Sequence, residues 1–243
     1  MRVDATNLGF KEINELLRSG EKEFTVTGCM GQRFIAAGMS DVTVNIEGTP
    51  GNALGAYLNG ASVIVNGSAQ DAAGDTMNEG LIVVRGNIGD AAGYAMRGGK
   101  IFVRDDAGYR AGIHMKAYMD KSPLLVIGGR AGSFLGEYQA GGTIVVLGLK
   151  GLSGGRERRI VGNFPCTGMH GGKMILRAPA SGIVFPDQVT AKRANEEDLA
   201  EIEGYVNEYC RFFGCDKDQI MDAEFTVVTP DSANPYKRLY VAN

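Results

Sequence analysis

Two aspartates have a spacing that could support chemistry. Asp71 and Asp90 stand nineteen residues apart, and Asn52 precedes Asp71 by the same step. If the chain winds one repeat onto the next, the two carboxylates would lie roughly 5 Å apart, which is compatible with glycosidase-like catalysis. The flanking sequence offers no general-acid partner and no aromatic platform for a sugar. Because Asn and Asp in turns commonly hydrogen-bond their own backbone, we expect these residues to stabilise their own turns.

Cys166 and His170 form a second candidate pair. On a helix their four-residue spacing would place them on one face, as a nucleophile with its base or as two zinc ligands. Residues 162–172 are rich in glycine and contain Pro165, so a helix is disfavoured there. We expect neither site. His114, the other histidine, is expected to be a hydrogen-bonded structural residue.

A ladder of methionines could suggest a soft metal site. Leu58, Met77, Met96 and Met115 each stand three residues after a repeated glycine. No thiolate or imidazole shares their position in the repeat, and methionine fills irregular cores well. We expect these four side chains to lie in the core.

A basic, glycine-rich insertion occupies residues 150–159 and contains Arg156, Arg158 and Arg159. It could bind an anion or the acidic surface of a partner, or remain a solvated loop. It lacks the Gly-Lys-Ser/Thr ending and the strand–loop–helix setting of a phosphate-binding loop. We retain the three arginines as candidate interface residues.

The element that positions these residues is a repeat of about nineteen residues over 42–148. Gly48, Gly67, Gly86 and Asp105 are spaced by nineteen, and another glycine follows each by seven. Short β-branched strands alternate with glycine-rich corners and leave no room for a helix. Such a period predicts an all-β solenoid, here of about 7–8 coils of ~19 residues. A shorter insertion of about four residues is expected around 118–123.

Each predicted strand carries two apolar residues separated by one position, which is the inward face of a period-two strand. Across eight strands all sixteen positions are apolar. They are Phe24/Val26, Val44/Ile46, Val63/Val65, Ile82/Val84, Ile101/Val103, Leu125/Ile127, Ile144/Val146 and Met174/Leu176. We expect these columns to stack in register.

We divide the chain into an N-terminal helical cap (1–22), a β-helix (23–180) and a C-terminal helix and tail that pack on the β-helix (181–243). In the cap, one helical face carries Phe10, Ile13, Leu16 and Leu17, with Asp4, Thr6 or Asn7 as the N-cap.

After Pro179 the repeat stops. Asn195 is the predicted N-cap of a long helix, with Asp198 at N3 and Gly214 at its end. The helix has an apolar stripe of Leu199, Ile202, Val206, Tyr209 and Phe213. A short helix at 216–221, a strand at 225–228 and a tail along the body are expected to follow.

The position between the two inward columns should face outward. It is polar in the first two strands, Thr25 and Asn45, and apolar in the next six. The apolar members, which we name the outward stripe, are Ile64, Val83, Phe102, Val126, Val145 and Ile175. A stripe of this length must be covered. We predict that the C-terminal segment covers one part and a partner, either another protein or a second copy, covers the rest.

The formal net charge of −3 with mixed signs gives no reason to expect nucleic acid or an anionic membrane as partner. No apolar run has the length of a membrane helix, and the start of the chain lacks a signal-peptide pattern. The cysteines Cys29, Cys166, Cys210 and Cys215 are expected to be free thiols in a reducing cytoplasm. We therefore expect a cytoplasmic protein.

The repeat glycines, together with residues 89–104 and 162–172, resemble the GXGXG domain at the C-terminus of the large subunit of glutamate synthase. A related version forms one of the subunits of formylmethanofuran dehydrogenase. The resemblance covers roughly residues 24–178. It implies a right-handed single-stranded β-helix, standing alone as in glutamate synthases that are split into separate polypeptides.

The resemblance implies a non-catalytic assembly subunit. The family's glutaminase uses an N-terminal cysteine, whereas this chain begins Met1-Arg2-Val3, and no cysteine cluster has iron–sulfur spacing. No catalytic, cofactor-binding or metal-binding residue is carried over. The implied partners are the amidotransferase and the synthase polypeptide, with FMN and iron–sulfur expected on the partners. Two alternatives stay open: the equivalent subunit of a formylmethanofuran dehydrogenase-like complex, and a stand-alone carbohydrate-active β-helix enzyme.

Overall fold

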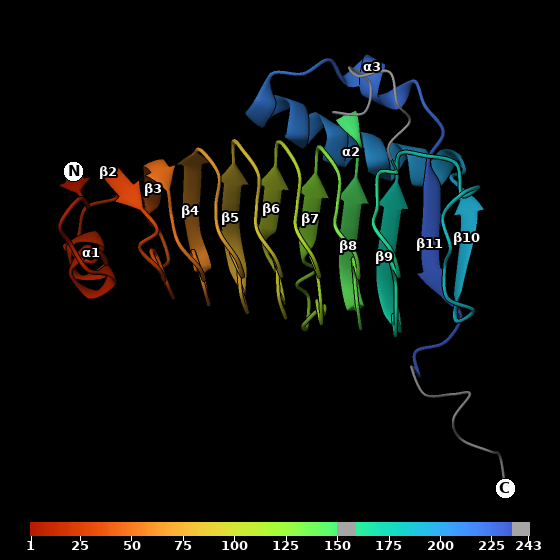
Figure 1. Cartoon of the computed structure of the whole chain (residues 1–243), viewed down its shortest axis with the longest axis horizontal. Coiled ribbons are helices and arrows are strands. Elements are labelled where there is room, and N and C mark those ends of the chain that lie inside the picture. Colours follow the sequence, from red (N-terminus) through yellow and green to blue (C-terminus); the bar gives the residue numbers. More distant parts are fainter. Residues whose placement is uncertain (150–158, 235–243) are drawn as a thin grey trace, which may run out of the picture.

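The computed structural model describes residues 1–149 and 159–234, and in this part of the chain eleven strands form one sheet wound as a β-solenoid (Figure 1). The strands are β1 (Arg2–Asp4), β2 (Glu23–Met30), β3 (Thr43–Thr49), β4 (Asn59–Asn66), β5 (Glu79–Val84), β6 (Lys100–Val103), β7 (Leu124–Ile127), β8 (Ala140–Val146), β9 (Gly171–Leu176), β10 (Val189–Arg193) and β11 (Thr226–Pro230). The helices are α1 (Phe10–Leu17), α2 (Glu196–Phe213) and α3 (Lys217–Met221). Strands β2 to β9 supply one coil each, which confirms the predicted fold class.

The strands stack in parallel and in register. Val63 pairs with Ile82, which pairs with Ile101, and the same alignment continues along the inward columns from β2 to β9. All sixteen predicted inward side chains are completely buried. The predicted register is confirmed, and like residues lie on like residues along the interior.

The opposite side of each coil is a corner built from alternating left-handed residues. Ala72, Gly74 and Thr76 have φ angles of 56°, 73° and 51°, and the equivalent positions of the neighbouring coils repeat this pattern. The N–H groups of Ala72 and Thr76 donate to the following coil, and that of Gly74 donates to the preceding coil. These bonds offset the cost of left-handed non-glycine residues, on the order of 1 kcal/mol each.

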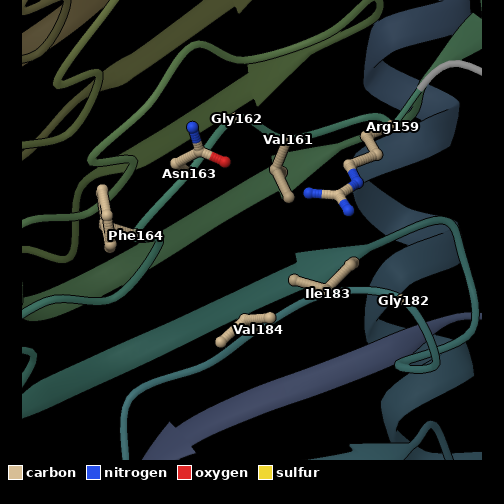
Figure 2. A pocket seen from close by; sticks show the side chains of 8 residues that line it. All are labelled: Arg159, Val161, Gly162, Asn163, Phe164, Gly182, Ile183 and Val184. Carbon is tan, nitrogen blue, oxygen red and sulfur yellow. The ribbon is translucent and has the colours of Figure 1, made fainter.

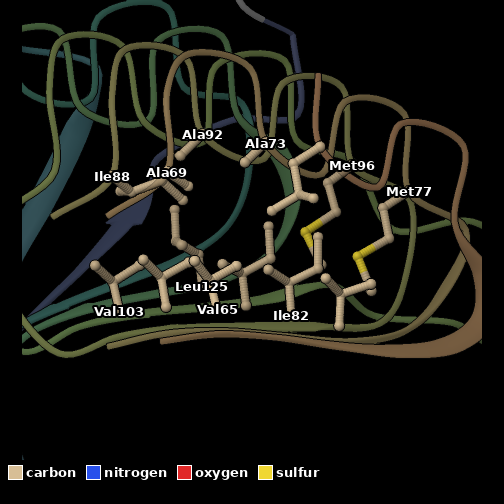
Figure 3. Packing of buried hydrophobic residues seen from close by; sticks show 14 of the residues in the cluster. Val65, Ala69, Ala73, Met77, Ile82, Ile88, Ala92, Met96, Val103 and Leu125 are labelled. Atoms are coloured by element: carbon tan, nitrogen blue, oxygen red, sulfur yellow. The ribbon is translucent and has the colours of Figure 1, made fainter. Parts of the chain in front are cut away.

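The methionine ladder fills the interior between the corners and the strands. Leu58, Met77, Met96 and Met115 are completely buried, as predicted for core residues. Figure 3 shows Met77 and Met96 extending from the corner side toward strand residues such as Ile82. The glycine three residues before each methionine leaves room for this packing, since a Cβ on Gly74 would lie 2.5 Å from Ile101 Cδ1.

The first end of the solenoid is closed by α1 and β1. The predicted caps Asp4, Thr6 and Asn7 are wrong: Gly9 is the N-cap, and its N–H donates to Glu12 Oε2 at 2.7 Å. Asp4 lies instead in β1, which pairs in parallel with β2.

Only part of the predicted α1 face is buried. Ile13 and Leu17 are buried, whereas Phe10 and Leu16 remain exposed because the helix rests on the first coil along a narrow edge. Asn14 fixes that contact, since its amide group donates to Phe34 O and accepts from Ala36 N–H.

The other end carries two further strands, of which β11 runs opposite to the coil strands and β10 runs in their direction. Strand β11 pairs antiparallel with β9, and β10 pairs antiparallel with β11, so the sheet ends in the order β9-β11-β10. The predicted strand at 225–228 is present as β11, whereas β10 was missed, and most of the tail predicted to lie along the body falls outside the described residues. Antiparallel addition continues the ladder of hydrogen bonds without another coil.

Long helix α2 has the predicted ends. Asn195 Oδ1 accepts from Asp198 N–H at 2.8 Å, the Asn195 N–H donates to Asp198 Oδ2, and Gly214 ends the helix with φ 68°. The short helix predicted at 216–221 is present as α3, and Asp216 is its N-cap. Within residues 1–149 and 159–234, no helix combines the length and apolar character needed to cross a membrane.

Substitution of one methionine of the ladder and of one exposed methionine tests how much the ladder contributes to stability. We expect Met96→Ala to lower the free energy of unfolding by about 2–5 kcal/mol, because it leaves a cavity in a closed interior. Met119→Ala is the matched control: Met119 is 86% exposed, so its loss should change stability by less than about 0.5 kcal/mol. Urea unfolding followed by circular dichroism measures both, and equal losses would contradict the assignment.

Candidate docking surface

The outward stripe is covered by the chain's own helix. Five of its members, Val83, Phe102, Val126, Val145 and Ile175, are buried, and Ile64 is partly buried. Four of the five, all except Val83, pack in one cluster with residues of α2, α3 and the segment that enters and begins β11, namely Ile202, Val206, Tyr209, Ile220, Phe225 and Val227. Figure 1 shows α2 crossing the coils on this side.

Polar contacts hold α2 in place at the margins of this cluster. Tyr209 Oη donates to Arg104 O at 2.9 Å, a contact that links residues far apart in sequence. Lys100 Nζ pairs with Glu208 at 2.7 Å. Burial raises the pKa of the Tyr209 hydroxyl well above its usual range, so it stays a hydrogen-bond donor.

Glu201 on α2 accepts from both Lys173 Nζ and Tyr205 Oη. Burial alone would raise the pKa of Glu201, but these two hydrogen bonds and the charge of Lys173 outweigh it and hold the pKa below 4.5. Burial and the adjacent Glu201 carboxylate raise the pKa of Tyr205 to about 12. The carboxylate therefore stays charged and tied to β9.

The predicted division of the outward stripe between tail and partner is therefore corrected. Because α2 packs on this side, five members of the outward stripe are buried and offer no free surface for another protein or a second copy, namely Val83, Phe102, Val126, Val145 and Ile175. Ile64 alone keeps a partly exposed side chain. The sequence could not show that an eighteen-residue helix matches the stripe, because the match depends on the path of residues 177–195.

Of the three arginines proposed for an interface, Arg156 and Arg158 lie outside the described residues. Arg159 is exposed, and its carbonyl accepts from Arg130 Nε. Beside it is a shallow cavity of about 190 Å³ at the last coil, lined also by Val161, Phe164 and Val184. Figure 2 shows the Arg159 side chain pointing toward Ile183 across this cavity.

Asp71 and Asp90 have a structural role. Asn52 Oδ1 accepts from Asp71 N–H, Asp71 Oδ1 from Asp90 N–H, and Asp90 Oδ1 from Tyr109 N–H, at 3.3, 2.9 and 2.8 Å. Each side chain thus bonds the backbone of the next coil. The structural role is confirmed, but the expected partner was wrong: the acceptors bond the backbone of the next coil and not that of their own turn, because stacking brings the N–H group of the next coil within reach.

Cys166 and His170 are engaged separately. Cys166 is completely buried and contacts Met174 Sδ at 3.4 Å, and burial raises the pKa of its thiol to about 12. His170 Nδ1 lies 2.9 Å from Gly168 O. The structure gives the two side chains different partners, as expected for core and turn residues.

The free surface lies on the corner side of the solenoid, where rings from successive coils touch. His114 stacks on Tyr138 with centroids 5.4 Å apart and 10° between the planes, and Tyr94 meets His114 edge-on at 5.9 Å. Phe134 contacts Phe164 at 5.3 Å. We name Tyr94, Tyr109, His114, Phe134, Tyr138 and Phe164 the aromatic face.

A charged pair is embedded in the aromatic face. The Arg110 guanidinium lies 4.8 Å from the centre of the Phe134 ring and pairs with Glu137 at 2.9 Å. Phe164 is 62% exposed at the end of the row. Stacked aromatics with an arginine are typical of protein–protein contact sites.

A groove lies along the same side, at an insertion between two coils. The insertion predicted around 118–123 contains a small hairpin, in which the backbones of Tyr118 and Lys121 exchange hydrogen bonds. Lys121 Nζ pairs with Glu79 at 2.6 Å, and the Arg97 guanidinium lies 5.9 Å from the centre of the Tyr118 ring. These contacts tie the hairpin to two neighbouring coils.

The groove beneath the hairpin has a volume of about 460 Å³ and is lined by Gly38, Tyr57, Asn59, Asn78, Arg97, Tyr118, Met119, Asp120 and Lys121. Tyr57 is 59% exposed and occupies the corner position of His114 and Tyr138, two residues after the repeated glycine. The groove and the aromatic face therefore follow one side of the solenoid.

Comparison with known proteins agrees with this architecture over nearly the whole chain. The sequence pattern of the GXGXG motif family matches residues 21–231. The chain belongs to the GXGXG family. The match extends beyond β2–β9 to include α2, α3 and the strands β10 and β11.

One relative of this GXGXG protein and one solved structure extend the comparison. Uncharacterized protein MJ1350 of Methanocaldococcus jannaschii is 42% identical over 249 residues, which cover 98% of this chain and 95% of that protein. A chain in the formyltransferase/hydrolase complex FhcABCD of Methylorubrum extorquens, solved with methylofuran, gives a TM-score of 0.66 at 20% identity. It covers 93% of this chain and 89% of that chain, and establishes a shared fold.

The aromatic face was missed by sequence reasoning, although a signal exists. His114 and Tyr138 each follow a repeated glycine by two residues, which places both on the same corner of successive coils. The outward direction of that position depends on left-handed backbone at φ 55° and 53°. Period-two reasoning, valid for strands, does not apply to such corners.

The hydrogen-bonding role of Asp90 can be separated from its charge. We expect Asp90→Asn to keep the acceptor for Tyr109 N–H and to leave stability nearly unchanged. Asp90→Ala removes the acceptor and should lower the free energy of unfolding by about 1 kcal/mol. Urea denaturation at pH 7 compares the variants. Equal losses in both would show that the carboxylate charge matters.

The attachment of α2 to the coils through Glu201 should weaken in acid. The pKa of Glu201 is lowered in the folded state from its ordinary value of about 4.5. The ionised carboxylate therefore contributes fully to the free energy of unfolding above about pH 4.5, and this contribution is lost as the pH falls through the folded pKa. We expect Glu201→Gln to lose less stability than the parent chain between about pH 5 and pH 3. Urea midpoints across this range measure the difference, with Glu197→Gln, an exposed change on the same helix, as control. Parallel pH profiles for the parent and Glu201→Gln would contradict the prediction.

Proposed function

We propose that this chain is an assembly subunit of a multi-subunit enzyme complex and that it holds catalytic partners without supplying the reaction centre. The observation that carries the proposal is the aromatic face with the adjoining groove. The outward stripe is closed by α2, and both ends of the sheet are closed by caps. The corner side is thus the surface best suited to a partner.

The complex that we favour is a glutamate synthase-type enzyme of ammonia assimilation. This choice rests on the resemblance of the repeat glycines and of residues 162–172 to the GXGXG domain of the glutamate synthase large subunit. The partners would be the amidotransferase and the synthase polypeptide, with FMN and iron–sulfur held by the partners. We place this assembly in the cytoplasm.

A second candidate complex has a specific observation in its favour. The solved chain that shares this fold over 93% of the present chain belongs to a formyltransferase/hydrolase complex. An equivalent role in a formylmethanofuran dehydrogenase-like complex therefore fits the fold at least as well. Both candidates assign the same task to this chain and differ in the partners.

The decisive experiment is mild affinity purification of this chain from its native host, with the co-purifying proteins identified by mass spectrometry. We expect an amidotransferase together with a flavin and iron–sulfur synthase polypeptide. Recovery of formyl-transfer subunits in their place would support the second candidate complex. Recovery of the chain alone, as a stable monomer, would overturn the assembly role.

A surface variant tests which side docks. Phe164 has φ 57°, a left-handed conformation that aspartate tolerates, so Phe164→Asp should fold normally. We expect Phe164→Asp to lower partner recovery at least about tenfold, as for the loss of a buried aromatic anchor. Met30→Asp is the control, because Met30 is an exposed apolar residue at the end of β2. Unchanged recovery with Phe164→Asp would remove the aromatic face from the proposal.

A further inference from the structure

Two cysteines meet where α2 ends. Cys210 lies in the last turn of α2, and Cys215 follows the C-cap Gly214. Gly214 adopts the left-handed conformation, and its N–H donates to Cys210 O at 2.8 Å, which reverses the chain. This reversal places the two Sγ atoms 2.9 Å apart. A disulfide bond measures about 2.05 Å, so a movement of less than about 1 Å would join them.

The pair differs from the other two thiols of the chain. Cys29 and Cys166 are buried away from any second cysteine, and burial raises their pKa values to about 11 and about 12. Cys210 and Cys215 are only partly buried, at the edge of the cluster formed by α2 and the outward stripe. A dissolved oxidant can therefore reach this pair.

We propose that Cys210 and Cys215 form a redox-active dithiol that exchanges with disulfide compounds and closes to an intramolecular disulfide. This site is independent of the proposed assembly function. Its co-reactant is a small-molecule or protein disulfide, and its product fixes the end of α2 to the segment that enters α3.

The exchange proceeds in two balanced steps. Cys215, as thiolate, attacks one sulfur of the co-reactant disulfide, which breaks the S–S bond, and the departing sulfur takes up a proton as the first thiol. Cys210 then loses its proton and attacks Cys215 Sγ, which releases the second thiol. Cys210 is assigned the second role because its Sγ already lies 2.9 Å from Cys215 Sγ. Burial and the adjacent Cys215 raise the pKa of Cys210 to about 12, which disfavours its attack on a dissolved disulfide in the first step.

Closure acts on the helix that covers the outward stripe. Tyr209, next to Cys210, donates from the last turns of α2 to Arg104 O, and Glu208 pairs with Lys100. A covalent link one residue further along would oppose fraying of this helix end. We expect slower amide hydrogen exchange over 206–216 in the oxidised chain.

The test uses the full chain and glutathione. The reduced protein is incubated in buffers of varied oxidised-to-reduced glutathione ratio, quenched with acid, alkylated and digested with trypsin. Trypsin cuts after Arg211, between the two cysteines, so a disulfide joins peptide 194–211 to peptide 212–217. We expect this cross-linked pair to exceed the singly glutathionylated peptides at least tenfold, while Cys29 and Cys166 stay alkylatable after unfolding.

Single variants serve as controls. In Cys210→Ser the thiol of Cys215 should form a stable glutathione adduct, which shows that the oxidant reaches the site, and no cross-link should form. Cys29→Ser should behave as the parent chain. If the parent chain yields no cross-linked pair under conditions that modify Cys215 in Cys210→Ser, the proposal is overturned.

Discussion

The structure depends on in-register stacking of parallel coils. Each strand position must face the same way as its equivalents in the coils on either side, because a shift of one residue would turn a whole inward column outward. The pairing of β2 to β9 satisfies this constraint at every inward position. The glycine corners, the methionine ladder and the carboxylate-to-backbone bonds all repeat at the same interval, so each supports the register set by the strands.

Sequence predicted those parts of the fold that repeat or that use local signals. The inward columns follow from a period of two, and the ends of α2 follow from Asn195, Asp198 and Gly214, whose hydrogen bonds are local. The addition of β11 and β10 to the end of the sheet was not predicted, because pairing between residues 176 and 226 has no local sequence signal. The candidate site was harder to predict from the sequence, because the direction of the His114 and Tyr138 side chains depends on left-handed corners that strand patterns do not describe.

The two sides of the solenoid serve different purposes. The strand side carries the outward stripe and is sealed by α2, which makes that helix part of the core. The corner side remains open and carries the aromatic face and the groove, which offer both aromatic and charged side chains. This division explains why the longest apolar stripe in the sequence was a poor guide to the docking surface: a stripe that needs cover can find it within the same chain.

Repetition at a fixed interval also gives the molecule a defined length. Phe34 and Phe164 occupy the same corner position six coils apart, and at about 4.8 Å per coil they are separated by roughly 30 Å. The corners bond to the coils on both sides, so this distance is set by hydrogen bonds on two faces. Any proteins bound at its two ends would be held at a separation counted in whole coils, and the addition or removal of one repeat would change that separation by a single step.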